Sequence, residues 1–555
     1  MGGWLRPPSP DSDKYKKDLL TDDSLDISQR EDLEKELGLN SPLDENIKTL
    51  ELMVGPSEDF VIRRIRVGKS QVRAAVIHLE ELSDSNKVER LVKNLCFDLL
   101  ETEQITASGA DDLFESIQQR LLSLGHTKEG RKFIEVWDSL AGGYAAVFFD
   151  GVDRALLCNT QGFEKRAVEE PASETVIRGP RSGFIESIGA NISLLRRFIK
   201  SPNLWFESYT LGSLTRTKVA MAYIKGLASE ELIKEVRQRV SRIDIDGILE
   251  SGHIEEFIED EHKCPFPLIF RTERPDRVAA NLLEGRVAIV VDNTPFVLVV
   301  PMDYHMLLQA PDDYYEKVPI GSFLRVIRLV GFWVSILLPG VYVATVNFHN
   351  EIFPTSLILK IASTREGVPF PVAFEVFIME FVFELLREAG IRLPRVIGPA
   401  ISIVGALVLG EAAIQAGLVS PAVVIVVALT AISSFTTPTF SLGIAARLIR
   451  FVFIILGSVF GLFGIQFGFL YLIISLASYR SFGYPYMLSA APMIVEDWKD
   501  LYLRTWFWDR IKRPKLTGAR EPVRARPGQK PGPGRAPEQS GQKKVVDAKA
   551  GKKKK

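Results

Sequence analysis

The sequence feature that most constrains the fold is a long stretch, from Leu329 to Tyr479, in which charged residues are sparse. Charges are concentrated in the N-terminal part instead, so the net charge of -1 hides a strong segregation. A helix that crosses a bilayer needs about 20 mostly apolar residues, and this stretch has room for several. We therefore predict an α/β soluble N-terminal region followed by an all-α polytopic membrane domain of about four to six helices, over residues 320–490.

Individual spans within this stretch differ in clarity. Three segments have the composition of a crossing helix, although the last is short: Leu329–Asn347, Val396–Ala416 and Pro421–Phe435. The nearly uncharged segment Phe451–Tyr479 is either one strongly tilted span or a tight helical pair. Phe370–Glu388 is apolar on average but contains glutamates, so a crossing, a re-entrant and an interfacial helix all remain open for it.

Basic residues flank the apolar stretch on both sides, with Arg325 and Arg328 at its start and a Lys- and Arg-rich tail after it. Cytoplasmic flanks carry an excess of Lys and Arg. We therefore predict both ends on the cytoplasmic side and an even number of crossings, taken as about four. The N-terminus has no apolar run of signal-peptide length, so the first span is expected to direct insertion.

The soluble region is predicted to contain two small α/β subdomains. Residues 1–55 form an acidic, mostly disordered extension with a possible short helix at Ser28–Leu37. The first subdomain covers residues 56–165, and its apolar spacing indicates these strands and helices: strands at Phe60–Ile62, Val72–His78 and Ala145–Phe149, and helices at Lys87–Leu100 and Ala110–Leu124. Residues 491–555 form a juxtamembrane segment and a basic low-complexity tail.

The second subdomain covers residues 166–310. Apolar residues recur at helical spacing from Phe184 to Ile199, Leu214–Ile224 alternates as a strand, and Glu230–Ile243 has amphipathic helical spacing. Arg286–Val291 and Phe296–Val300 are expected to pair as a hairpin, because Asn293 between them tolerates the positive φ of a tight turn.

No residues point to catalysis. Cys96, Cys158 and Cys264 are widely spaced and form no metal-binding or disulfide pattern, and the histidines show no pairing at ligand spacing. We therefore predict no enzyme activity, no catalytic residues, no cofactor and no metal site. The basic tail lacks the stacking aromatics of nucleic-acid binders, so attraction to membrane lipid is expected there and nucleic-acid binding is not.

Acidic residues inside the apolar stretch are the candidate ion-path or gate residues. A charged Glu in hydrocarbon costs on the order of 2–3 kcal/mol and usually faces the protein interior. Glu380 and Glu384 lie one helical turn apart, and Glu411 and Gln415 repeat this spacing, with Glu375 nearby. The alternative is that the first group lies on the wet face of an interfacial helix and that Glu411 makes an interhelix hydrogen bond.

Glycines recur at helical spacing near the end of the apolar stretch, and the expected role of all four is close helix packing on one face: Gly457, Gly461, Gly464 and Gly468. A pore-facing glycine stripe is the alternative. In the second subdomain, Arg178, Arg181, Arg196 and Arg197 form a basic cluster that either binds an anion, lipid or acidic partner or is simply solvated.

Several ordered motifs resemble the A-type subunits of the GerA spore germination receptors and their sporulation stage V relatives. The motif residues are Arg178, Gly179, Pro180 and Arg181, then Glu273, Arg274, Pro275 and Asp276, then Glu284, Gly285 and Arg286. Ser481–Tyr486 and Ala491-Pro492 continue the resemblance, which spans most of the chain from Asp59 to Pro492.

The resemblance implies a subunit of a nutrient germinant receptor in the bacterial cell membrane and spore inner membrane. It also implies a homo-oligomer that acts with B-type transporter-like and C-type lipoprotein subunits and conducts ions when nutrient is sensed. An accessory stage V membrane protein without its own nutrient response is one alternative. A secondary solute transporter is another, although the spans show no inverted repeat.

Overall fold

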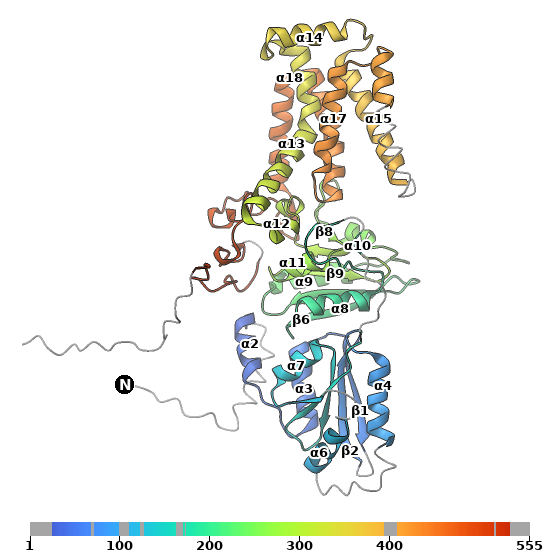
Figure 1. Ribbon diagram of the computed structural model, residues 1–555, viewed down its shortest axis with the longest axis vertical. Coiled ribbons are helices and arrows are strands. Elements are labelled where there is room, and N and C mark those ends of the chain that lie inside the picture. The colour runs from blue at the N-terminus through green and yellow to red at the C-terminus, as the bar shows by residue number, and fades with distance from the viewer. Residues whose placement is uncertain are drawn as a thin grey trace, which may run out of the picture.

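The computed structural model describes residues 25–67, 71–98, 110–121, 127–162, 170–171, 174–392, 408–515 and 518–532. The molecule is elongated: two α/β units lie one after the other at one end, and long helices extend from the second unit at the other (Figure 1). Parts of several sequence predictions lie outside the described residues: 1–24, the ends of the helices at Lys87–Leu100 and Ala110–Leu124, most of Val396–Ala416, and the tail from residue 533.

The first unit is an antiparallel five-stranded sheet between two helical layers, with the strand order β1-β2-β4-β5-β3. Its strands are β1 (Phe60–Val67), β2 (Val72–Leu79), β3 (Thr127–Gly130), β4 (Tyr144–Phe149) and β5 (Ala155–Asn159). Its helices are α3 (Leu43–Val54), α4 (Ser85–Lys93), the short π-helix η1 (Asn94–Asp98), α6 (Ala110–Leu121) and α7 (Phe133–Ala141). Because successive strand side chains point to opposite faces, Ala75 and Ile77 pack under α3 and α7, whereas Val76 packs on the side of α4 and α6.

The second unit repeats this arrangement, with the strand order β6-β7-β9-β10-β8. Its strands are β6 (Leu204–Leu211), β7 (Thr217–Ile224), β8 (Phe270–Thr272), β9 (Val287–Val291) and β10 (Val297–Val300). Its helices are α8 (Ile188–Phe198), α9 (Glu230–Ser241), α10 (Ser251–Ile258) and α11 (Pro275–Leu282). The helices α8 and α11 cover one face and α9 and α10 the other. In chain order, α8 corresponds to α3 and α11 to α7.

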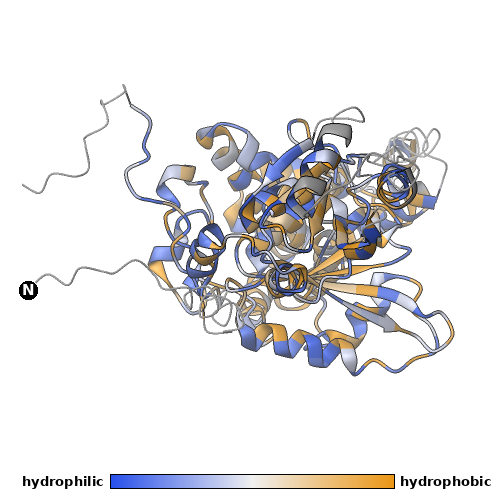
Figure 2. Ribbon diagram, turned by 90° about the horizontal axis from the view of Figure 1, so that it is seen from below, coloured by the Kyte–Doolittle hydropathy of each residue, from blue (hydrophilic) through white to orange (hydrophobic). Residues whose placement is uncertain are grey.

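The central strands β4 and β9 are buried on both faces, which explains why their sequences are nearly continuous apolar runs. Figure 2, a view along the long axis, shows long hydrophobic stretches on strand ribbons and alternating hydrophilic and hydrophobic residues on helices. The predicted hairpin is confirmed: β9 pairs with β10, and Asn293 in its turn has a φ of 67°.

The region before residue 56 differs from the predicted extension. The helix α2 (Ile27–Glu36) lies beside the boundary of the two units (Figure 1), and α3 belongs to the first unit. Leu43, Ile47 and Leu50 of α3 are buried in its core. The acidic composition suggested a disordered extension because α3 is amphipathic. Its charged residues lie on the solvent side, and its apolar stripe covers the sheet.

The C-terminal region is helical. After η2 (Tyr304–Leu307) and α12 (Asp312–Tyr315) come these elements: α13 (Val318–Phe348), η3 (Asn350–Ile352), α14 (Thr355–Arg365), α15 (Val372–Arg392), α17 (Pro421–Phe435) and α18 (Phe440–Ser478). Two of them, α13 and α18, are long and apolar enough to cross a membrane, and α17 is a shorter apolar helix. The fold is therefore two α/β units followed by a helical region with two candidate apolar spans.

The helix α18 reverses direction at Gly461, so it is a helical hairpin. Gly461 has the backbone angles φ 61° and ψ -149°, which only glycine adopts readily. Both ends of α18 lie near the second unit: Thr439 Oγ1 donates to the Leu307 carbonyl at 3.0 Å, and Ser481 Oγ donates to the Leu268 carbonyl at 2.7 Å. Of the two predicted possibilities for this segment, the structure shows the tight pair.

This reversal corrects the predicted single glycine face. A straight helix would align the four glycines, but the turn at Gly461 places them on two antiparallel arms. A Cβ at Gly457 would lie 2.4 Å from the Gly340 carbonyl oxygen of α13, and one at Gly464 would lie 2.5 Å from the Leu456 carbonyl oxygen. The glycines therefore contact different neighbours at backbone distance.

Candidate functional site

The two α/β units are joined through Arg196 at the end of α8. Its guanidinium is fully buried and forms an ion pair with Asp59 of the first unit, with Nε to Oδ2 at 2.8 Å. It also lies over the rings of Trp137 and Phe206. Arg196 is therefore a buried interdomain contact and does not belong to an exposed basic cluster with Arg178 and Arg181, which are both exposed.

The resemblance motifs converge at the end of the second unit that faces the helices. Arg274, the residue before α11, is buried and forms an ion pair with Asp276 at 2.8 Å. It also donates to the carbonyls of Glu174 and Pro180, and so fixes the loop that contains Arg178, Gly179 and Arg181. Two motifs separated by about ninety residues in the chain thus form one cluster.

Tyr315 of α12 completes this cluster. Its hydroxyl donates to Asp276 Oδ2 at 2.6 Å, and its ring lies against Gly179, where a Cβ would approach within 2.5 Å. Gly179 also has a φ of 136°, which disfavours other residues. The motif cluster therefore holds the start of the helical region against the second unit.

The third motif contacts the C-terminal segment. Glu284 accepts from Arg510 and from Arg524, each at 3.3 Å, and Gly285 lies against Ala519. Arg286 is buried and forms an ion pair with Asp303 at 2.6 Å. We call residues 488–515, which pass along the base of α13, the C-terminal strap; it contains the short helices η4 (Val495–Trp498) and η5 (Phe507–Asp509).

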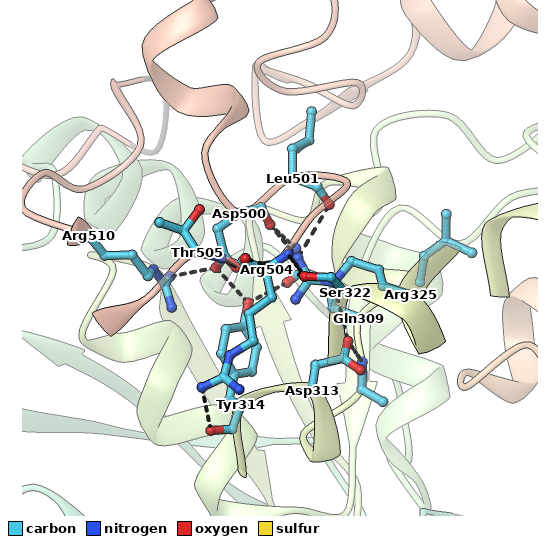
Figure 3. Close-up of polar contacts among 12 residues, drawn as sticks. Gln309, Asp313, Tyr314, Ser322, Arg325, Asp500, Leu501, Arg504, Thr505 and Arg510 are labelled. Atoms are coloured by element: carbon cyan, nitrogen blue, oxygen red, sulfur yellow. Dashed lines mark hydrogen bonds and ion pairs between the residues drawn. The ribbon is translucent and has the colours of Figure 1, made fainter. Parts of the chain in front are cut away.

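Asp500 is the centre of the strap contacts (Figure 3). Its carboxylate lies 3.4 Å from Arg325 Nη1 of α13 and 3.2 Å from Arg510 Nη2, and it accepts from the Tyr314 hydroxyl at 2.9 Å. Arg325 also pairs with the fully buried Asp313 at 3.3 Å. This junction cluster ties together the strap, α12 and the first long helix.

A cavity of about 270 Å³ lies between α11, η2 and the strap. Its lining includes Asp276, Arg286, Asp303 and Asp500, which are engaged in the ion pairs above, and His305. Burial lowers the pKa of His305. Opposite charges on the lining pair with one another, so the cavity presents no large excess of one sign.

A second charged cluster lies inside the helical region. Arg450 of α18 and Glu380 of α15 form an ion pair at 2.6 Å, and both side chains are fully buried. Arg450 Nε also donates to the Ser335 carbonyl of α13 at 2.7 Å. One guanidinium therefore connects three helices. We call the five charged residues Glu380, Glu384, Arg387, Arg447 and Arg450 the membrane-region cluster.

The cluster continues one helical turn along α15. Glu384 pairs with Arg447 at 2.9 Å and lies 3.7 Å from Arg387. Arg387 donates to the Ser434 hydroxyl of α17 at 2.8 Å. Arg447 and Arg387 are therefore counter-ions of Glu384, one of the predicted gate residues.

The remaining candidates lie elsewhere. Glu375 is buried at the start of α15, pairs with Arg365 at 3.3 Å and accepts from the Ser420 amide at 2.8 Å. Glu411 and Gln415 are exposed on the helical segment 408–415, where Gln415 Nε2 donates to Glu411 Oε1 at 3.1 Å. The structure therefore brings Glu380 and Glu384 together but separates them from Glu375 and from the Glu411 pair.

Sequence reasoning missed the junction cluster. Asp313, Asp500 and Arg504 carried no motif, and Arg325 was interpreted only as a flank of the apolar stretch. Arg504 donates to the carbonyl of Tyr314 at 3.0 Å and to that of Glu316. The sequence contained one usable signal, because Asp and Arg residues occur on both sides of the apolar stretch. Such residues are expected to form ion pairs when the two flanks of the stretch meet in the fold.

A comparison with protein families matches residues 48–516 to the model described as Bacillus/Clostridium GerA spore germination protein. Among curated proteins, the chain is 46% identical to "Spore germination protein KA" of Bacillus subtilis (strain 168) over 91% of this chain and 92% of that protein. It is 37% identical to "Spore germination protein GerLA" of Bacillus cereus, over 85% of this chain and 94% of that protein.

Among solved structures, the chain matches the crystal structure of the N-terminal domain of the A subunit of the Bacillus megaterium spore germinant receptor GerK3. The sequence identity is 36%, the TM-score is 0.39, and the match covers 48% of this chain and 96% of that one.

Proposed function

Since this chain belongs to the Bacillus/Clostridium GerA spore germination protein family, we propose that it is the A subunit of a nutrient germinant receptor and that its helical region forms a gated ion-release channel. In this proposal, copies of the chain assemble into an oligomer and act with B-type and C-type subunits. The observation that carries it is the membrane-region cluster, because charged side chains among apolar helices are costly and rare, and those that occur mark ion pathways or gates.

The proposed membrane placement follows from the directions of the helices. Glu375 at the start of α15 lies near Ser420 at the start of α17, and both helices run from there toward the second unit, which Thr439 reaches after α17. These two successive helices therefore have the same direction. With α13 entering and α18 forming a hairpin, both flanks of the helical region lie on one side, and we propose that this side is cytoplasmic.

We assign different roles to the two acidic groups. The Glu380–Arg450 pair lies inside the helical region of one chain and connects α13, α15 and α18, so it acts as a latch that holds these helices in a closed arrangement. Glu411 and Gln415 are exposed on the surface of one chain, so they line a cation path where copies of the chain meet. Gating requires two arrangements with different affinity for the partner subunits.

The experiment is ion flux from liposomes that contain the full chain with its B-type and C-type subunits. We expect nutrient-triggered K⁺ release, reduced at least about tenfold by Glu411→Gln because the path loses its negative charge. The matched control is Glu388→Gln on α15, whose carboxylate is exposed and paired with Arg392. The control should retain the flux.

Other outcomes separate the alternatives. Assembly without flux under any nutrient contradicts the channel and favours the accessory stage V role. Uptake of a solute coupled to an ion gradient favours a secondary transporter. Equal flux in the Glu411→Gln and Glu388→Gln variants contradicts the assigned path while leaving the channel itself intact.

A further inference from the structure

Large apolar side chains lie on the outside of the C-terminal strap, while its inner side is held by the junction cluster. Leu503 is 58% exposed and Trp506 46%. The rings of Trp506 and Trp508 are near each other, with centroids 5.8 Å apart. A contiguous exposed patch of this kind marks an interaction surface.

This patch continues the exposed apolar surface of α13. The Arg504 amide, between Leu503 and Trp506, donates to Ser322 Oγ of α13 at 3.1 Å. The next residue of that helix, Phe323, is 64% exposed, and exposed apolar side chains follow it at Val326 and Val330. Figure 1 shows the strap in dark red beside the lower end of α13, next to α12.

Most of the charges around the patch are paired within the strap. Lys499 lies 3.5 Å from Asp509, and both Lys512 and Lys515 pair with Glu496, at 3.7 and 2.9 Å. Arg504 and Arg510 point inward to Tyr314 and Asp500 (Figure 3). The outer surface therefore offers apolar and aromatic groups with only a small basic excess, which suits an uncharged apolar boundary better than a polyanion.

We propose that the strap around Leu503 and Trp506 is a lipid-interface anchor, which rests on the boundary between headgroups and acyl chains on the side of the α/β units. Indole rings favour this depth because one edge is polar and the rest is apolar. The inference rests on the proposed placement of α13 in the membrane. Its consequence is that Asp500, through Arg325 and Tyr314, couples the bilayer surface to the base of α13 and to α12.

The test uses the full chain in nanodiscs of zwitterionic phosphatidylcholine, with Cys96 and Cys264 replaced by Ser and the buried Cys158 kept. A bimane label is placed on Trp506→Cys, and its fluorescence is quenched by lipids that carry a nitroxide either near the headgroup or near the acyl-chain end. We expect quenching at least about twofold stronger with the headgroup-proximal nitroxide, because the side chain lies at the interface. Adding anionic phosphatidylglycerol should not change this ratio.

Two reference positions make failures distinguishable. A label on Ile177→Cys, a 93% exposed position of the second unit, should not be quenched, and one on Ile455→Cys of α18 should be quenched most by the deep nitroxide. If Ile455→Cys is unquenched, the membrane placement fails. If Ile455→Cys is quenched but Trp506→Cys behaves like Ile177→Cys, the strap proposal is overturned, as it is if quenching at residue 506 requires the anionic lipid.

Discussion

The two α/β units share one strand order and one arrangement of helices, but they differ at corresponding positions around the ends of their sheets. Arg274, which precedes α11 in the second unit, is buried in the motif cluster, whereas Lys132, which precedes α7 in the first unit, is exposed. At this pair of corresponding positions, the charge is therefore buried only in the unit that contacts the helical region.

The same contrast appears between the central strands. In the second unit, Arg286 before β9 pairs with Asp303 after β10. In the first unit, Gly143 precedes β4, and the Thr160 hydroxyl after β5 donates to its carbonyl at 2.9 Å. A neutral hydrogen bond thus joins the ends of β4 and β5 in the first unit, whereas an ion pair joins the ends of β9 and β10 in the second. The comparison teaches that the two units differ in the residues at the ends of their sheets while they share one topology.

The largest expected difference between the two units is that between Arg274→Ala and Lys132→Ala, two substitutions at corresponding positions. The first removes one partner of a buried ion pair and leaves Asp276 uncompensated, so we expect a loss of about 3–5 kcal/mol in the free energy of unfolding. The second should change it by less than about 0.5 kcal/mol. Thermal unfolding of the full chain in detergent measures both, and similar effects would show that the two positions are equivalent.

A smaller effect tests the boundary between the units. Glu34 of α2 accepts from Asn203 Nδ2 at 3.3 Å, and burial raises its pKa to about 7. A raised carboxyl pKa means that the folded state binds the proton more tightly, so this contribution is complete below the ordinary pKa of 4.5 and is lost as the pH rises through about 7.

We therefore expect Glu34→Gln to stabilise the chain at pH 8, by up to about 3 kcal/mol, and to have little effect at pH 4. Asp32→Asn, at an exposed position of the same helix, is the control and should have little effect at either pH. Unfolding curves recorded across this range measure the difference. A stabilisation of equal size at both pH values would mean that the titration of Glu34 does not cause it.

The smallest expected effect concerns the turns between corresponding strands. Asn293 in the β9–β10 turn has a φ of 67°, and Gly151 in the β4–β5 turn has a φ of 92°. Asn293→Val should cost about 1–2 kcal/mol, because a β-branched residue is strained in the left-handed region. Asn293→Gly should stay within about 0.5 kcal/mol, since relief of strain is offset by the added freedom of the unfolded chain. If Val is tolerated as well as Gly, the turn is not rigid.

Periodicity and turn chemistry were sufficient for much of the fold. The β9–β10 hairpin and the central strands followed from apolar runs and from one Asn, because these are local properties. The repeated topology could not be predicted, since the two units share an arrangement without a visible sequence repeat. Gly461, where the helix reverses, lies against Phe348 and His349, which are far away in the sequence, so the spacing of glycines alone suggested a straight face.

The candidate site was predictable only in part. Glu380 and Glu384 stood out because charges in an apolar stretch are rare, and their spacing placed them on one face of α15. Their partners Arg447 and Arg450 were visible in the sequence, but which helices meet is a long-range property. Asp500 was hidden for the same reason, because nothing in the strap sequence indicates that it folds back to Arg325.

The most direct test of the central claim is basal ion flux after removal of the latch. In liposomes that contain the full receptor, the double variant Glu380→Gln and Arg450→Gln removes both charges and so leaves no unpaired buried ion. Our account predicts K⁺ release without nutrient, at least about tenfold above the unmodified receptor, because the closed arrangement loses its connection between α13, α15 and α18. A correctly assembled double variant that stays closed without nutrient and opens normally with it would contradict the account.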